Sequence, residues 1–234
     1  MGRVTIASLN LQCGIGTRWQ PYDVEAAIMS LDAPVIVLQE TWSPDALAPD
    51  PVGSAAKRLG ARLYRVPVRH VDNLAEVFIP VQSGPGTIGI ALLSALPVTG
   101  YEVLGLGDVP NDTVSRQAQI ATIETDGGAS LRLAGTHLTY RLLSPVQLAR
   151  LMRHLRRSKL PTVIAGDFNM PRQLARLAPG YAPAVRGRTW PAELPILQLD
   201  HVLAGRRVQP VRGTVLPPAG SDHLPIRASL RLPG

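Results

Sequence analysis

The sequence is poor in cysteine, in lysine and in aromatic residues, and these shortages exclude several classes of protein. Cys13 is the only cysteine, which excludes an internal disulfide framework and a metal cluster built on several thiolates. No apolar stretch approaches the roughly 20 residues of a membrane helix, so no transmembrane segment is expected. The first predicted strand begins at Arg3 or Val4, which leaves no room for a signal peptide. We therefore expect a soluble, cytoplasmic protein.

The net charge of +7 and the isoelectric point near 10.3 permit attraction to nucleic acid or another polyanion. Almost all of the basic charge is arginine, because Lys57 and Lys159 are the only lysines, and no block of five basic residues occurs. A biased base composition of the source genome also produces such a pattern. The charge alone therefore does not identify a partner.

The length and hydrophobic content suffice for one large core or two small ones: the chain has 234 residues, 45% of them hydrophobic. It has no internal repeat and no segment that resembles a linker between domains. We expect a single domain over residues 1–234, and a monomer.

Apolar runs and helical patterns alternate along the chain and predict an α/β fold. Asp126 to Gly128 form a turn signal that predicts a hairpin of the strands on either side. Residues 45–88 are harder to interpret, with a helix near Ala55–Leu59, a strand over Ala61–Val68 and a loop-rich stretch, Asp72–Gly86, that contains Pro80. The other expected strands are Val4–Leu9, Val35–Leu38, Gly89–Ser94, Gln117–Glu124, Leu131–Thr136, Val163–Ala165, Ile196–Leu203, Thr214–Leu216 and Ile226–Leu232, and helices begin at Pro21 and Ser144.

The stretch from Thr162 to Met170, T-V-I-A-G-D-F-N-M, carries the clearest chemical signal. A short apolar run predicts a strand buried on both faces, and Asp167 and Asn169 follow at its carboxyl end. Buried carboxylates and amides are costly unless they are paired or bind a ligand, and α/β sheets bind ligands beyond the carboxyl ends of their strands. The structural alternative is an Asx-turn that merely ends the strand.

Other predicted strands end in polar residues in the same way. The whole set is Asn10, Glu40, His137, Asp167, Asn169, Asp200, Asp222 and His223. Each has an ordinary alternative; Glu40, for example, could simply be an acid at the start of a helix. Together they supply hard oxygen ligands suited to Mg²⁺, and they include no cysteine and no H-x-x-x-H zinc spacing. Carboxylates, amides and two imidazoles around a divalent ion are suited to phosphodiester hydrolysis.

In this combination the chain resembles the endonuclease/exonuclease/phosphatase superfamily, the Mg²⁺-dependent, DNase I-like fold of nucleases, AP endonucleases, sphingomyelinases and inositol-polyphosphate phosphatases. The matching pieces span nearly the whole chain in the family's order. They are S-L-N at 8–10, L-Q-E-T at 38–41, G-I-A-L-L-S at 89–94, G-T-H-L at 135–138, A-G-D-F-N at 165–169, T-W-P-A at 189–192, L-D-H-V-L at 199–203 and S-D-H-L-P at 221–225.

The resemblance implies a four-layered α/β sandwich, in which two packed mixed β-sheets are flanked by helices, and a role for each candidate residue. Asn10, Glu40 and Asp222 would hold Mg²⁺ or Mn²⁺. Asp167 would orient or activate the attacking water, and Asn169 and His137 would face the phosphate. His223 would contact the scissile phosphate, with its tautomer fixed by Asp200. Arg116 could contact phosphate as well, although such an arginine is at least as often solvated.

Departures from the family's subgroups leave the substrate open. Gln12 stands where many AP endonucleases carry an acid, and His137 occupies their active-site tyrosine position. Ile164–Ala165 and Met170–Pro171 flank the G-D-F-N motif, unlike the usual inositol phosphatase pattern. We expect an endonuclease or exonuclease that acts on nucleic acid. The alternatives are a phosphatase or phospholipid phosphodiesterase of the same superfamily, and a non-catalytic polyanion-binding protein.

Overall fold

The computed structural model describes residues 2–46, 49–77, 81–108, 112, 114–140, 142–176 and 178–233. Pro80, part of the loop-rich stretch expected over Asp72–Gly86, lies outside these residues. The strands are β1 (Arg3–Asn10), β2 (Val35–Pro44), β3 (Arg62–Val71), β4 (Gly86–Ser94), β5 (Val98–Gly105), β6 (Gln117–Glu124), β7 (Ser130–His137), β8 (Thr162–Asp167), β9 (Tyr181–Pro183), β10 (Asp200–Gly205), β11 (Gln209–Val215) and β12 (Ile226–Arg231). The helices are α1 (Val24–Met29), α2 (Pro51–Arg58), α3 (Ser144–Leu155) and α4 (Arg172–Ala175), with 3₁₀ turns at Gln12–Gly14 and Leu74–Glu76.

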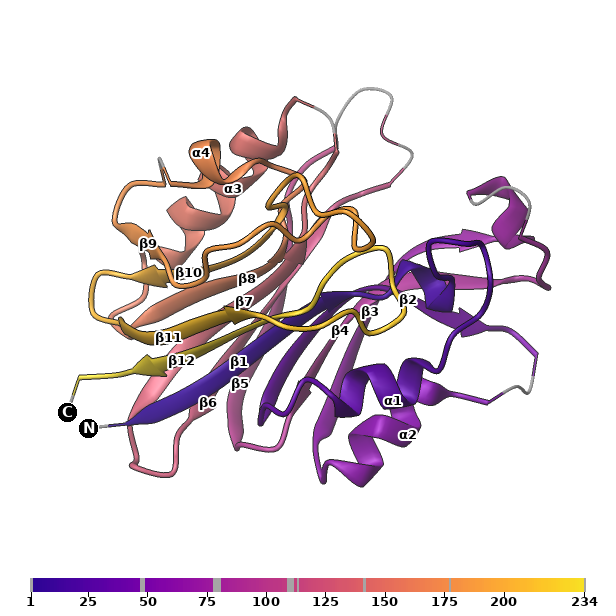
Figure 1. Cartoon of the computed structure of the whole chain (residues 1–234). Coiled ribbons are helices and arrows are strands. Elements are labelled where there is room, and N and C mark those ends of the chain that lie inside the picture. Colours follow the sequence, from indigo (N-terminus) through magenta and orange to yellow (C-terminus); the bar gives the residue numbers. More distant parts are fainter. Residues whose placement is uncertain are drawn as a thin grey trace.

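The strands form two six-stranded mixed sheets packed face to face. The first sheet has the order β11-β12-β1-β2-β4-β3 and the second the order β5-β6-β7-β8-β10-β9. In Figure 1, α1 and α2 lie together on the outer side of the first sheet, and α3 and α4 lie on the far side of the second. The four-layered α/β sandwich implied by the sequence is therefore confirmed.

Three apolar clusters hold the layers together, as the strand alternation requires. The middle cluster fills the space between the sheets and includes Val37, Leu133 and Val163. The outer clusters pack α1 and α2 on the first sheet and α3 on the second. The sheets approach closely at Gly135, where an added Cβ would lie 2.8 Å from a methyl group of Val37.

Several predicted boundaries need correction. The helix expected from Pro21 begins at Val24, because Asp23 is the residue whose side chain caps it, accepting from Ala26 N. Strand β2 continues beyond Leu38 to Pro44, because its partner β4 is long enough to pair with it past a bulge. Strand β10 begins at Asp200, preceded by a loop.

Two strands were missed. Strand β5 is an edge strand with mostly exposed side chains, so its sequence lacks the apolar alternation of a buried strand. Strand β9 has only three residues and pairs with β10 at the other edge of the same sheet.

Each sheet contains one parallel pair, β1 with β2 and β7 with β8. The carboxyl ends of these four strands meet at one edge of the sandwich, which is where the candidate polar residues are carried. Among the described residues, no helix is long and apolar enough to cross a membrane.

Candidate active site

A hydrogen bond between the last residues of β1 and β8 connects the two sheets at the site. Asn10 Nδ2 donates to Asp167 Oδ2 at 3.1 Å and to Glu40 Oε1 at 3.3 Å, so one buried amide joins both sheets. The amide is held in turn, because Asn10 Oδ1 accepts from Gln12 N at 2.9 Å. In this arrangement the amide nitrogen faces the carboxylates and the oxygen faces away, so Asn10 aligns the acids. Its role as a metal ligand stays a prediction.

A bulge in β2 turns Glu40 into the site. The pairing of β2 with β4 shifts between Leu38 and Thr41, and Glu40 takes a left-handed backbone conformation with φ of 47°. Strand β3 also shifts register, between Pro67 and Arg69, on the other side of β4. Gly89 of β4 lies between the two bulges, where an added Cβ would stand 2.6 Å from Val66 O. The glycine of the G-I-A-L-L-S motif therefore allows both neighbouring strands to bulge.

A glycine also positions Asp167. Gly166 has φ of 144°, a conformation that only glycine adopts easily, and an added Cβ would overlap the carbonyl oxygen of Thr136 on β7. The next residue, Asp167, is 1% exposed, and its Oδ1 accepts from the backbone N–H of Asn169 at 2.8 Å. The Asx-turn that the sequence analysis gave as an alternative is therefore present. The second oxygen of Asp167, Oδ2, still faces the polar groups of the site.

His137 and Asn169 form the side of the site that belongs to the second sheet. Asn169 Nδ2 lies 3.0 Å from His137 Nε2 and donates to Leu138 O at 3.1 Å. The amide nitrogen can only donate, so Nε2 of this ring accepts and the proton lies on Nδ1. His137 Nε2 is also 3.5 Å from Asp167 Oδ2 and 3.9 Å from Glu40 Oε1.

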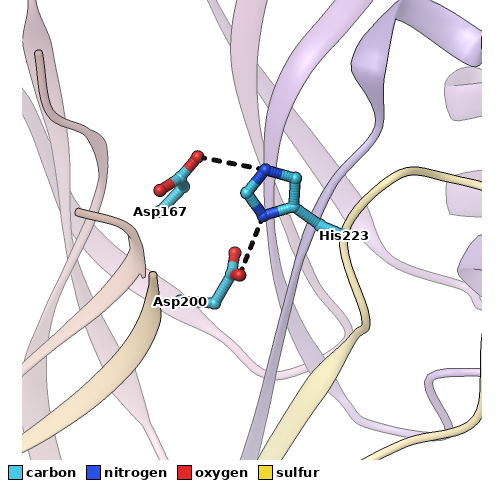
Figure 2. A group of neighbouring side chains, drawn as sticks. All are labelled: Asp167, Asp200 and His223. Carbon is cyan, nitrogen blue, oxygen red and sulfur yellow. Dashed lines mark hydrogen bonds and ion pairs between the residues drawn. The ribbon is translucent and has the colours of Figure 1, made fainter. Parts of the chain in front are cut away.

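His223 lies between two carboxylates (Figure 2). Its Nδ1 is 2.9 Å from Asp200 Oδ2, and its Nε2 is 3.8 Å from Asp167 Oδ2. Asp200 is fully buried, and its other oxygen, Oδ1, has no hydrogen-bond partner among the described residues. The contact between Asp200 and His223 is the one that the sequence analysis expected.

The two imidazoles of the site differ in protonation state. Burial alone would lower the pKa of His223, but the carboxylates of Asp200 and Asp167 outweigh it and raise the pKa to about 10. Burial holds the pKa of His137 well below its ordinary value, and the positive charges of Arg116 and His223 add to the effect. At neutral pH His223 is therefore a cation, whereas His137 is neutral.

Two of the acids, Asp167 and Glu40, have raised pKa values. Burial and the neighbouring Asp200 raise the pKa of Asp167 to about 7, against the opposing charge of His223. Burial and the charge of Asp222 raise the pKa of Glu40. A carboxylate whose pKa is raised by burial and by a neighbouring carboxylate lacks enough positive charge around it.

Asp222 completes the set from the loop before β12. Its Oδ2 accepts from the indole N–H of Trp190 at 3.2 Å, and its Oδ1 is 3.3 Å from Ser221 Oγ. With the amide of Gln12 turned so that its nitrogen faces Asp222, a further hydrogen bond of 3.1 Å forms. The positive charges that act to lower the pKa values of Glu40 and Asp167 are those of His223 and Arg116.

Arg116 is 8% exposed, so it is not the solvated arginine of the sequence alternative. Its Nε donates to Asp112 Oδ2 at 3.1 Å, and the side chain of Asp112 is itself almost fully buried. The charge of Arg116 acts on both Glu40 and His137, which places the guanidinium beside the site.

The donor set fits a divalent cation. Glu40, Asp167, Asp200 and Asp222 bring four carboxylates, against the His223 imidazolium and an Arg116 that is already paired with Asp112. Both contacts of the Glu40 carboxylate are made by Oε1. Asp167, Asp200 and His223 each offer an atom within 4.8 Å of the others, a buried group that could hold a metal ion. Within that group, His223 already supplies positive charge between Asp167 and Asp200.

Sequence reasoning missed the residues that support this set. Thr189 Oγ1 accepts from the backbone N–H groups of Leu199 and Asp200, at 3.1 and 3.3 Å, and so fixes the start of β10. Ser221 Oγ donates to Asn10 O at 2.6 Å and ties the Asp222 loop to β1. Thr189 and Trp190 lie in T-W-P-A and Ser221 in S-D-H-L-P, so the motifs marked these positions without showing their contacts.

Comparison with known proteins finds a matching family model and similar folds. The model of the Endonuclease/Exonuclease/phosphatase family matches residues 7–223. An endonuclease/exonuclease/phosphatase structure from Beutenbergia cavernae is 19% identical, with a TM-score of 0.73 over 100% of this chain and 72% of the other. The human Nocturnin catalytic domain with bound sulfate is 18% identical, with a TM-score of 0.71 over 99% of this chain and 95% of that domain. The mannosyl-6-phosphatase Bt3783 of Bacteroides thetaiotaomicron is 14% identical, with a TM-score of 0.72 over 98% and 100% of the two chains. No curated protein sequence matches the chain.

Proposed function

Because the chain belongs to the endonuclease/exonuclease/phosphatase family, whose members hydrolyse phosphate esters, we propose that it is a divalent-metal-dependent hydrolase of phosphodiester bonds that acts on nucleic acid. The observation that carries the proposal is the line of three buried side chains, Asp200, His223 and Asp167, which faces the carboxylates Glu40 and Asp222. Placing so many acids at one sheet edge is costly for the fold, and a catalytic role accounts for the cost.

The metal would be held by Glu40 and Asp222, with Asn10 beside them. When bound, a divalent cation supplies a Lewis acid that polarises a phosphoryl oxygen and offsets the charge of the transition state. Trp190 and Ser221 hold Asp222 in place through their hydrogen bonds, and the β2 bulge holds Glu40. Supporting contacts of this kind orient metal ligands in proteins.

The remaining residues of the site act on the water and the phosphate. Asp167 accepts a proton from the attacking water, whose oxygen forms the new bond to phosphorus. His223, with Nδ1–H donated to Asp200, presents Nε2 to a phosphoryl oxygen, and Asn169 and His137 line the same side. The bond from phosphorus to the leaving oxygen breaks, and that oxygen takes a proton from solvent water. The products are a phosphomonoester and an alcohol.

A substrate panel tests the proposal directly. Plasmid, abasic duplex, single-stranded RNA, sphingomyelin and phosphoinositides are incubated with the protein and Mg²⁺, and parallel samples contain EDTA. We expect metal-dependent cleavage of nucleic acid and a loss of about 10²-fold or more in kcat for Asp167→Asn, as for other positioned acid–base groups. Cleavage of only the lipids or of phosphomonoesters would replace the nuclease proposal with one of the alternatives.

A matched variant separates catalysis from binding alone. Asp126→Asn changes the same kind of side chain in the hairpin turn between β6 and β7, remote from the site, and should leave kcat unchanged. If Asp167→Asn and Asp126→Asn have the same activity while both remain folded, the proposed chemistry is wrong. If no substrate is cleaved but polyanions bind, the protein is a non-catalytic member of the family.

A further inference from the structure

A cavity of about 350 Å³ opens directly beside Glu40 and His137. One wall comes from β3 and β4, where Val68, Ile88 and Ile90 line it, and the opposite wall comes from the segment before β6, where Val114 lines it. We call this space the Ile88 cavity. Its volume lies within the range of small-ligand sites in proteins.

The bulges that aim Glu40 also shape this cavity. The register shift of β3 falls between Pro67 and Arg69, so Val68 is the unpaired residue of that bulge. On the adjoining strand, Ile88 and Ile90 are two residues apart and therefore face the same side. Both Val68 and Ile88 are only half-buried, so their side chains still present apolar surface to a ligand.

The charged groups of the cavity are paired with one another. Arg116 is held by Asp112 at 3.1 Å, and Arg69 lies 3.7 Å from Glu76. Binding along a nucleic acid backbone depends on cations that neutralise successive phosphates. The Ile88 cavity instead offers branched apolar walls with a few ion pairs at hand, next to the reacting groups.

On the basis of the proposed function, we propose that the Ile88 cavity receives one nucleoside-sized group of the substrate. The aromatic base of this group lies against Val68, Ile88 and Val114, and its sugar carries the phosphate that reacts. The substrate is then a nucleic acid end or a small nucleotide. The interior of a duplex is a poor substrate, because a paired base would first have to leave its stack at a cost of about a few kcal/mol. A polyol such as a sugar or inositol is also disfavoured, because it has no apolar face of the size of a base to cover Val68, Ile88 and Val114.

Binding of two related compounds tests the cavity independently of hydrolysis. Adenosine 5′-monophosphate and ribose 5-phosphate differ only in the base, and their binding is measured by calorimetry with Mg²⁺ and again with EDTA. We expect adenosine 5′-monophosphate to bind about tenfold more tightly or better, since a tenfold gain corresponds to roughly 60 Å² of apolar base surface removed from water. Equal affinities for the two compounds would overturn the proposal.

Three variants locate the base. Ile88→Trp and Val68→Trp fill the cavity from two different strands and should each remove the preference for adenosine 5′-monophosphate. Val211→Trp adds the same bulk on β11, at the opposite edge of the first sheet from β3 and β4, where the side chain is 53% exposed, and should keep the preference. Thermal unfolding shows whether each variant folds. If a folded Ile88→Trp or Val68→Trp protein keeps the preference, the base lies elsewhere and the proposal is wrong.

Hydrolysis separates this inference from the proposed function. A dinucleoside monophosphate should be cleaved with a higher kcat/KM than its analogue without bases, and closed circular single-stranded DNA should be cleaved more slowly than linear strands. Cleavage of both dinucleotides at equal rates would overturn the cavity proposal and leave the phosphodiesterase proposal intact. Base-dependent binding without any metal-dependent cleavage would overturn the phosphodiesterase proposal and leave the base-binding role of the cavity intact.

Discussion

Replacing Asp200 with asparagine should slow the reaction while leaving the fold intact. The substitution preserves the shape of a fully buried side chain but removes the negative charge that lies 2.9 Å from His223 Nδ1. A hydrogen bond to a charged group contributes about 1.5–3 kcal/mol and a neutral one about 0.5–1.5 kcal/mol. The difference of about 1–1.5 kcal/mol corresponds to roughly a tenfold loss in kcat if it acts in the transition state.

A larger loss is expected if the new amide turns its nitrogen toward the ring. Nδ1 would then accept instead of donating, so the ring would lose its Nδ1 proton and, with it, the positive charge that faces the phosphate. Where the equivalent substitution leaves a catalytic histidine with the wrong ring nitrogen protonated, kcat falls by about 10⁴. The expected range for Asp200→Asn is therefore about 10- to 10⁴-fold in kcat.

The neighbouring residue provides the control, because it points to the opposite face of β10. His201 Nε2 contacts Met170 O at 2.8 Å, and its ring packs on Phe168 at a centroid distance of 5.1 Å. His201→Ala should therefore lower the free energy of unfolding by about 2 kcal/mol or more, with less than about a tenfold change in kcat of the folded protein.

The assay is steady-state cleavage of the best substrate of the panel over a range of Mg²⁺ concentrations, with thermal unfolding of each variant. Asp200→Asn should lower kcat far more than it raises the Mg²⁺ concentration for half-maximal rate. Normal turnover of Asp200→Asn together with an inactive but folded His201→Ala would refute the assigned roles of these two residues.

Three further predictions concern the metal ligands and the backbone of the site. Glu40→Gln should raise the Mg²⁺ concentration for half-maximal rate by at least about tenfold, and full activity in EDTA would contradict the assignment. Trp190→Phe removes one hydrogen bond to Asp222 and should raise the same concentration about two- to tenfold; an unchanged value would show that the indole N–H is dispensable. Gly166→Ala should lower the free energy of unfolding, measured with denaturant, by about 3 kcal/mol or more. The control Gly128→Ala, at φ of 72° with nothing within 4 Å of the new Cβ, should lower it by about 1 kcal/mol. Equal losses would show that the contact of the new Cβ with β7 does not add to the cost.

The sequence was sufficient to predict the elements whose residues are buried on both faces. Strand β8 carries an apolar run and β1 an alternating pattern, and the polar residues at their ends, Asn10 and Asp167, are brought together as their strand-end positions indicated. The four-layered architecture came from the resemblance, because apolar periodicity does not state which strands share a sheet.

The sequence could not predict the features that depend on a partner far along the chain. The left-handed conformation of Glu40 arises from the mismatch between β2 and β4, which no local pattern of L-Q-E-T reveals. The indole of Trp190 meets Asp222 across 32 residues of sequence, and the Ile88 cavity exists only where two bulges flank one strand. Edge strand β5 was missed because its exposed residues carry no burial pattern.

The pairing of β1 with β12 has a consequence for the synthesis of the protein. Thr5 and Ser229 are hydrogen-bonding neighbours although 224 positions separate them, so β1 leaves the ribosome long before its partner exists. Until then one edge of β1 is open, a state that favours slow folding and contact with other nascent chains. His223 and Asp222 immediately precede β12, so the nascent chain gains these two residues of the site at the same stage at which the open edge of β1 is covered.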